Sequence, residues 1–121
     1  MKLAVHADVA AAIAARRAVV ALESTVIAHG LPRPQNLVAA RALEEEVRGL
    51  GSTPATIAVA DGQAIVGADD ALLVRLAEDS AVAKVSLRDL APVLARRGLG
   101  ATTARRAASA AATSGWTASF T

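Results

Sequence analysis

The first strongly apolar run of this 121-residue chain ends in side chains that can transfer protons and bind polar ligands. Residues 18–22 are all apolar, and Glu23, Ser24 and Thr25 come directly after them. A loop that begins at His29 and is rich in glycine and proline follows. In α/β folds, ligands bind just beyond the carboxyl ends of strands. The pattern therefore favours a ligand site around Glu23.

Glu23 is the main candidate for a catalytic side chain. A carboxyl group acts as a general acid near neutral pH when its pKa is raised, and burial beside apolar strands can raise it. A carboxylate after a buried strand can equally be a cap or the partner of a cation. Position alone leaves both roles open.

Lys84 is the only lysine away from the N-terminus. It follows an apolar run, and Ser86 with Asp89 has the spacing of a helix capping box. An amine at a strand end beside a helix N-terminus suits the binding of phosphate or sugar oxygens. The alternative is a solvated lysine, as most lysines are.

Other polar residues give weaker signals. Thr102 and Thr103 follow Gly100 in a glycine-containing turn, where they could bind a phosphate or cap a helix. His29 could orient a substrate or bond to the backbone, and Asn36 lies in the same loop. With two histidines and no cysteine, the chain cannot form a histidine cluster or a thiolate site for a metal.

The order of apolar segments predicts an α/β fold with a mixed sheet flanked by helices. Strands are expected at residues 18–23, 55–60, 63–67 and 82–86. The Asp61-Gly62 dipeptide between the second and the third strand predicts a tight hairpin, because glycine tolerates a positive φ.

Helices are expected between the strands. Asp8 can cap the first helix, Asp69 or Asp70 the third and Ser86 the fourth. Glutamates 44–46 should fall mostly on the wet side of the second helix. Its apolar stripe is predicted to comprise Leu37, Ala40, Leu43, Val47 and Leu50.

Composition indicates one domain without disulfides. The net charge is only +2 despite a pI near 9.9, so the charge predicts no general surface for polyanions. No apolar run approaches the ~20 residues of a membrane span, and the N-terminus lacks the apolar core of a signal peptide. We expect a cytoplasmic protein.

The composition changes after residue 103. Thirteen of the eighteen residues in 104–121 are Ala, Ser or Thr, none is acidic, and the only Trp and the only Phe lie here. We therefore divide the chain into a domain at 1–103 and a tail at 104–121. The tail has the character of a frameshifted end, and a divergent Ala-rich helix is the alternative.

Several blocks of this sequence resemble one family. Residues 19–36, with their Glu-Ser-Thr, His-Gly and Pro-x-Pro-Gln-Asn, closely resemble the N-terminal signature of the pseudouridine-5′-phosphate glycosidases, also called indigoidine synthase A-like proteins. Residues 54–59, 62–67, 84–90 and 100–103 are similar to further blocks of that family. The resemblance stops after Thr103, and members are more than twice as long.

The resemblance implies a reaction, a fold and a set of site residues. The family cleaves the C–C glycosidic bond of pseudouridine 5′-phosphate to give uracil and ribose 5-phosphate. Glu23 stands at the place of its proton donor and Lys84 at that of a substrate-binding lysine. Ala104, after the Thr pair, stands where the family makes a further substrate contact.

The resemblance also implies parts that this sequence does not contain. The family uses a lysine nucleophile and a divalent metal, typically manganese, and both the nucleophile and the metal ligand lie downstream of the blocks seen here. It forms homotrimers. The chain is thus expected to be a truncated N-terminal part of the fold, without glycosidase activity of its own.

Two other interpretations remain open. The chain could be a non-catalytic domain that binds a sugar phosphate or serves oligomerisation. It could also be a small basic protein whose Arg105, Arg106 and Trp116 contact nucleic acid. The leading interpretation expects a small-molecule substrate and neither a nucleic acid nor a membrane as partner.

Overall fold

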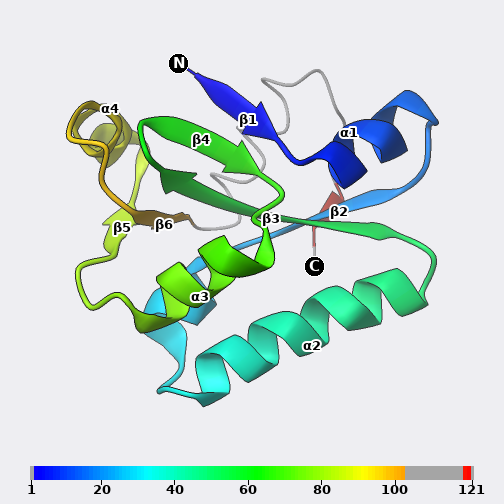
Figure 1. Cartoon of the computed structure of the whole chain (residues 1–121), viewed down its shortest axis with the longest axis horizontal. Helices are drawn as coiled ribbons and strands as arrows, with labels where there is room; N and C mark the ends of the chain where they lie inside the picture. Colours follow the sequence, from blue (N-terminus) through cyan, green and yellow to red (C-terminus); the bar gives the residue numbers. More distant parts are fainter. Residues whose placement is uncertain (1, 103–118, 121) are drawn as a thin grey trace.

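The computed structural model describes residues 2–102 and 119–120. These residues form one mixed sheet with helices on both faces, which confirms the predicted fold class (Figure 1). The strands are β1 (Leu3–Val5), β2 (Val19–Leu22), β3 (Thr53–Ala60), β4 (Gln63–Val66), β5 (Ala83–Val85), β6 (Gly100–Thr102) and β7 (Ser119–Phe120). The helices are α1 (Ala7–Ala14), the π-helix η1 (Val26–Gly30), α2 (Gln35–Gly49), α3 (Asp70–Glu78) and α4 (Leu87–Ala95).

Strand β3 is the centre of the sheet. Along one edge it pairs antiparallel with β4, which in turn pairs in parallel with β1. Strand β2 pairs in parallel with the first half of β3, up to Leu22 beside Thr56, and β6 pairs antiparallel with the second half, with Ala101 beside Ala58. Strands β2 and β6 therefore run along β3 from opposite directions, and their carboxyl ends meet.

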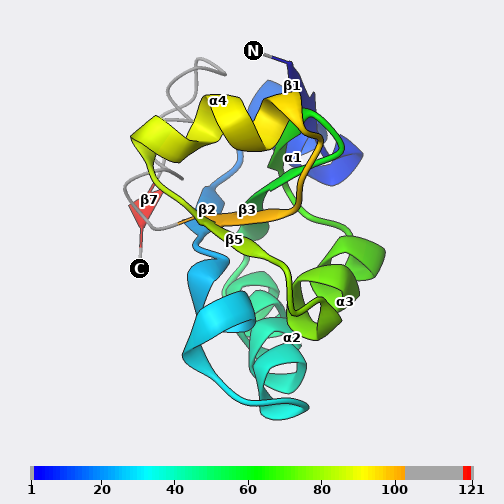
Figure 2. The same ribbon diagram turned by 90° about the vertical axis from the view of Figure 1, so that its left-hand side faces the viewer.

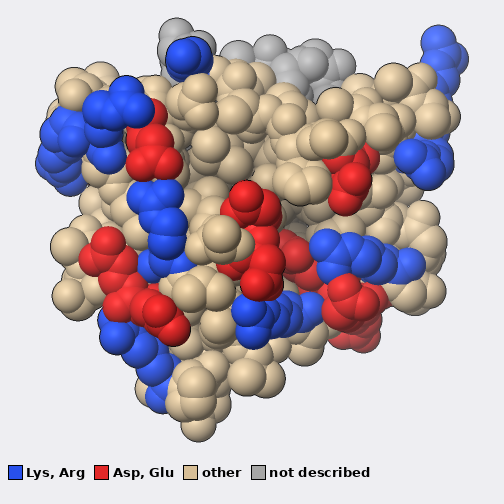
Figure 3. All heavy atoms as spheres, viewed as in Figure 1, with Lys and Arg blue, Asp and Glu red and all other residues tan. Residues whose placement is uncertain are grey.

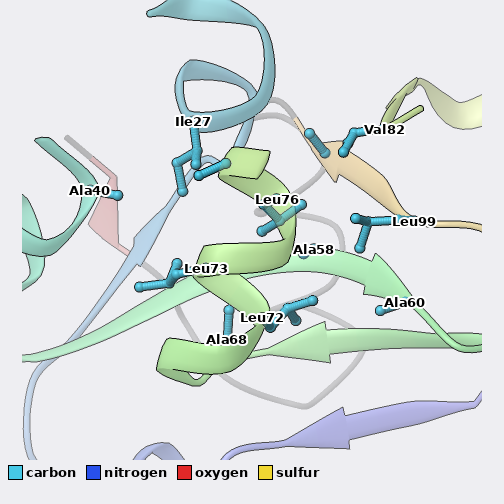
Figure 4. Close-up of a cluster of buried hydrophobic side chains, with 12 residues drawn as sticks. Ile27, Ala40, Ala58, Ala60, Ala68, Leu72, Leu73, Leu76, Val82 and Leu99 are labelled. Atoms are coloured by element: carbon cyan, nitrogen blue, oxygen red, sulfur yellow. The ribbon is translucent and has the colours of Figure 1, made fainter. Parts of the chain in front are cut away.

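The helices divide between the two faces of the sheet (Figures 1 and 2). Side chains alternate along a strand, so Ile57 and Val59 of β3 pack on the face covered by α1 and α4, whereas Ala58 and Ala60 pack on the opposite face. On that opposite face, α3 contributes Leu72, Leu73 and Leu76 to the core (Figure 4). Helix α2 and η1 complete this layer.

The four predicted strands are confirmed as β2, β3, β4 and β5, with small shifts of their ends. The Asp61-Gly62 hairpin is also confirmed, and both of its residues have a positive φ. Strand β6 replaces the predicted turn at 100–103. It can lie close to β5 because residue 100 is glycine, and a Cβ there would overlap the Val85 side chain.

Two expectations about helices were wrong. The N-cap of α1 is His6, whose Nδ1 accepts a hydrogen bond from the Asp8 N–H at 3.1 Å, so Asp8 is capped and does not itself cap. In α2, Leu43 and Leu50 of the predicted stripe are 39% and 81% exposed. Ala40 and Val47 of the predicted stripe are buried as expected, and Asn36 and Glu44 complete the buried face.

Polar contacts explain why α2 buries a face that differs in part from the predicted one. Glu44 is only 7% exposed, and its Oε2 accepts a hydrogen bond from the Thr56 hydroxyl at 2.7 Å. Asn36 is buried as well and bonds to backbone carbonyls of two other elements. Both side chains find hydrogen-bond partners in neighbouring elements, so the helix buries the face that carries them. Glu44 is therefore buried, whereas the sequence predicted it on the solvent-exposed side.

Most of the predicted tail at 104–121 lies outside the described residues. The exception is β7, which pairs in parallel with β2 through Ser119 beside Val20 and Phe120 beside Ala21. These two residues extend the sheet. The proposed boundary at residue 103 stays a prediction.

Candidate functional site

The candidate site lies where the carboxyl ends of β2 and β6 meet on one edge of β3. Four residues make this junction: Ser24 and Thr25 after β2, Thr102 at the end of β6, and Ile57 in β3 between them. Below, the term junction refers to these four residues. Glu23 directly precedes the junction, and Thr103 directly follows it.

Ser24 bonds to both neighbouring strands. Its Oγ donates to the Ile57 carbonyl at 2.6 Å and accepts from the Thr102 N–H at 2.9 Å. Its N–H donates to the Thr102 carbonyl at 3.1 Å. Ser24 is 0% exposed, so each of these bonds is made away from water.

Two threonine hydroxyls add to the junction. Thr25 Oγ1 donates to the Thr102 carbonyl at 2.7 Å, and Thr102 Oγ1 donates to the Ile57 carbonyl at 2.9 Å. The Ile57 carbonyl lies between the carboxyl ends of β2 and β6. A buried carbonyl without a partner is costly, and the hydroxyls of Ser24 and Thr102 fill this gap in the strand ladder.

Glu23 lies between two buried residues but is itself exposed. Leu22 before it and Ser24 after it are buried, whereas the Glu23 side chain reaches solvent. The burial that was expected around this carboxyl group is therefore absent from the described part of the chain. The backbone position of Glu23 is nevertheless fixed by its two neighbours.

Lys84 is the middle residue of β5 rather than a residue after it. Ala83 and Val85 pack toward α4, so alternation places Lys84 on the other face of the sheet, which carries η1. Lys84 is exposed and lies in register with Ala101, and Val85 lies in register with Thr102. Lys84 is thus one position from the strand partner of Thr102.

Thr102 is the link between the two predicted site residues. It bonds to Ser24, which follows Glu23, and it pairs with Val85, which follows Lys84. Glu23 and Lys84 are therefore each next in the chain to a partner of Thr102, and together the two side chains could donate a proton and bind an anionic oxygen. Ala104 lies outside the described residues, so its predicted contact stays a prediction.

The loop after Glu23 is anchored by side chains whose roles the sequence did not reveal. Asn36 Nδ2 donates to the carbonyl of Ile27 in η1 at 3.0 Å and to that of Ala77 in α3 at 2.9 Å. Arg33 Nε donates to the same Ala77 carbonyl at 3.0 Å. Asn36 is therefore a scaffold residue, whereas His29 is exposed at the end of η1.

A second polar region lies on α2, α3 and the β3–β4 turn (Figure 3). It includes a hollow of about 370 Å³ between α1, α2 and the start of α3, lined by residues such as His6, Arg41, Glu44 and Asp70. None of Glu23, Lys84 and Thr102 lines this hollow.

The charges of this second region are paired with one another. Arg41 makes two hydrogen bonds of 2.8 Å to the Asp70 carboxylate, and Arg75 bonds to that of Asp61 at 3.0 and 3.3 Å. The hydrogen bonds from these arginines hold the pKa of each aspartate below its usual value. We call the ion pairs Arg41–Asp70 and Arg75–Asp61 the charged face.

The described helices include none with both the length and the apolar character needed to cross a bilayer.

Comparisons with known proteins show which family the chain resembles. The family model of the indigoidine synthase A like proteins matches residues 8–119. A pseudouridine-5′-phosphate glycosidase of Streptomyces griseus is 55% identical over 109 residues, which are 90% of this chain and 34% of that protein. The protein of the same name from Salinispora tropica is 52% identical over 89% of this chain and 33% of its own length.

Solved structures show the same fold. The prealnumycin C-glycosynthase AlnA in complex with ribulose 5-phosphate superposes with a TM-score of 0.84 and 39% identity, over 99% of this chain and 38% of AlnA. An indigoidine synthase A-like protein from Thermotoga maritima gives a TM-score of 0.75 and 28% identity, over 84% of this chain and 34% of its own.

The chain spans about a third of the length of the curated relatives that it matches. The family match runs to residue 119 and so extends past the predicted boundary at residue 103. On the family match and these identities, the chain belongs to the indigoidine synthase A-like family, whose curated relatives are named pseudouridine-5′-phosphate glycosidases.

Proposed function

We propose that this chain provides the N-terminal part of a pseudouridine-5′-phosphate glycosidase site, with Glu23 as proton donor and Lys84 as a substrate-binding residue. The observation that carries this proposal is the junction, which brings the ends of β2 and β6 together beside both residues. The names of the curated relatives support the reaction. The sugar phosphate in the AlnA complex supports the substrate class.

The chemistry assigns a role to each of the two side chains. Cleavage of a C–C glycosidic bond leaves an electron pair on the carbon of uracil, which must take up a proton before the base departs. Glu23 would supply that proton as a general acid. The Lys84 ammonium would bind anionic or hydroxyl oxygens of the sugar phosphate through charge-assisted hydrogen bonds.

The exposure of Glu23 fits a site that is completed by other parts of the protein. A general acid works best when it is shielded from water, and the described residues do not cover this carboxyl group. We propose that the two thirds of the relatives that this chain does not match supply the cover. The same two thirds would supply the lysine nucleophile that the resemblance implies.

Manganese does not fit the described residues. Across 2–102 and 119–120, no three His, Cys, Asp or Glu side chains lie together in an arrangement that could hold a metal ion.

The test is transfer of the site into a complete enzyme. A chimera would join residues 1–102 of this chain to the remainder of the Streptomyces griseus glycosidase. We expect it to release uracil from pseudouridine 5′-phosphate, and the Glu23→Gln variant to lose at least 100-fold in kcat, as general acids contribute ~100–10,000-fold. An active chimera that tolerates Glu23→Gln would refute the role of Glu23.

The chain on its own gives the complementary result. Covalent catalysis is lost when the nucleophilic amine is absent, so the isolated chain should release no uracil. Uracil release by the isolated chain that disappears in Lys84→Ala would make Lys84 the nucleophile and would contradict the assignment.

A second candidate function is non-catalytic binding of a sugar phosphate. The exposure of both Glu23 and Lys84 favours it for the isolated chain, because an open half of a site can bind without turnover. Binding of ribose 5-phosphate by the chain, together with an inactive chimera, would support this alternative.

A further inference from the structure

We propose that Ser24 is a positioning residue for this site: its buried hydroxyl fixes the chain at Glu23 relative to the chain that leaves β6 at Thr102. The inference rests on the proposed function for its catalytic consequence. Its structural part, the locking of two strand ends by one hydroxyl, stands on the contacts of Ser24 alone.

Burial and bonding identify the hydroxyl as the active part of Ser24. The residue is 0% exposed, so its hydroxyl has no contact with bulk water. The hydroxyl instead bridges two strands, since it donates to Ile57 in β3 and accepts from Thr102 in β6. Both ends of the bridge are backbone atoms, so it sets the separation of the strands themselves.

The hydroxyl bridge of Ser24 lies close in the chain to the predicted site residues. Glu23 precedes Ser24 by one residue, and the predicted substrate contact at Ala104 follows Thr102 by two residues. No regular ladder joins β2 to β6, because the two strands lie end to end along β3. Between the ends of β2 and β6, side-chain hydroxyls therefore make the contacts that backbone hydrogen bonds make within a sheet.

Removal of the Ser24 hydroxyl should make the junction less ordered without unfolding the domain. In Ser24→Ala the Thr102 N–H loses its acceptor, whereas the Ile57 carbonyl keeps the Thr102 hydroxyl. The backbone bond from the Ser24 N–H to the Thr102 carbonyl also remains. A displacement of ~1 Å at a reacting group can cost ~100-fold in rate, so a small opening is sufficient to affect catalysis.

The first test measures order in the chain itself by NMR. We expect Ser24→Ala to lower the backbone order parameter of Glu23 and to raise hydrogen exchange at the Thr102 amide at least tenfold. Ser80→Ala is the matched control, because it makes the same chemical change at an exposed position between α3 and β5. Ser24→Cys, of similar size and with a weaker donor, should give an intermediate change and covers the case in which Ser24→Ala does not fold.

The second test measures catalysis in the chimera described above. Ser24→Ala should lower kcat by about 10- to 100-fold, with a smaller change in KM, because misplacement of a proton donor affects the transition state more than binding. Ser80→Ala should leave kcat within threefold.

The outcomes separate this proposal from the proposed function. If Glu23 and Thr102 keep their order in Ser24→Ala, or if Ser80→Ala disturbs them equally, the positioning role is refuted. If the parent chimera is inactive, the proposed function fails, and the NMR comparison still decides whether Ser24 locks the two strand ends. An active chimera with the same kcat in Ser24→Ala refutes the catalytic consequence.

Discussion

The junction is stabilised by buried neutral hydrogen bonds, whereas the charged face is stabilised by exposed ion pairs. At the junction, neutral hydroxyls of Ser24 and Thr102 bond to backbone atoms inside the protein. On the charged face, Arg41 and Arg75 hold aspartates whose side chains are 66% and 59% exposed. The two regions belong to one small domain, but only the junction directly follows Glu23 in the chain.

The difference shows where position is controlled. An exposed ion pair contributes little net free energy, because water and salt compete for both partners. A buried hydroxyl between two backbone groups has no such competitor, and its loss leaves an unpaired polar atom. We therefore expect the junction to determine geometry at the site, whereas the charged face should add only modestly to the contact of α2 with α3.

Ser24→Ala should show the largest stability change among these polar contacts. Because the Thr102 N–H would lose its buried acceptor, we expect the free energy of unfolding to fall by about 1–3 kcal/mol. Ser80→Ala makes the same chemical change at an exposed position and should stay within ~0.5 kcal/mol. Urea unfolding of both variants checks this, and equal losses would remove the distinction between junction and surface.

Glu44 offers an intermediate case, because its carboxylate is buried but belongs to α2. Glu44→Ala leaves the Thr56 hydroxyl without its acceptor, and we expect a loss of about 1–2 kcal/mol. Glu46→Ala on the same helix is exposed and should change stability by less than ~0.5 kcal/mol. If the two variants unfold alike, Glu44 does not account for the buried face of α2.

The ion pair Arg41–Asp70 should couple weakly. A double-mutant cycle with Arg41→Ala and Asp70→Ala is expected to give only a small coupling energy, and a smaller one in high salt, because both side chains are exposed. Thermal unfolding at low and high salt measures it. A coupling as large as the loss in Ser24→Ala would contradict the contrast between the two regions.

The smallest effect concerns pH. The pKa of Asp70 is lowered by its hydrogen bonds with Arg41, so the folded state binds a proton less readily than the unfolded state. The stabilisation from this pair is present above the unfolded value of about 4 and is lost as the pH falls through the lower folded value. The Tm difference between wild type and Asp70→Asn should therefore shrink below about pH 4. A constant difference from pH 7 to pH 2 would show that the pair does not act through ionisation.

The sequence predicted the parts of the fold that depend on local pattern. The apolar run before Glu23 is β2, Asp61-Gly62 is a hairpin, and Asp69 caps α3. Each of these follows from residues that are adjacent in the chain. The family resemblance, carried by blocks of the same kind, is confirmed as well.

The missed parts depend on contacts between distant segments. Strand β6 is stabilised only by its neighbours β3 and β5, and three residues with one glycine carry no strand pattern of their own. Asn36 and Glu44 are buried because they find partners in α3 and β3. Ser24 looked like part of a motif, and only the structure shows that its hydroxyl joins two strands 33 and 78 residues away along the chain.

The most direct test of the central claim is an NMR titration of the isolated chain with ribose 5-phosphate. The claim is that the junction holds half of a sugar-phosphate site. We predict chemical-shift changes that centre on the amides of Glu23, Lys84 and Thr102 and that weaken in Lys84→Ala. Changes that centre instead on Arg41 and Arg48 beside the hollow, or no changes at millimolar ligand, would contradict it.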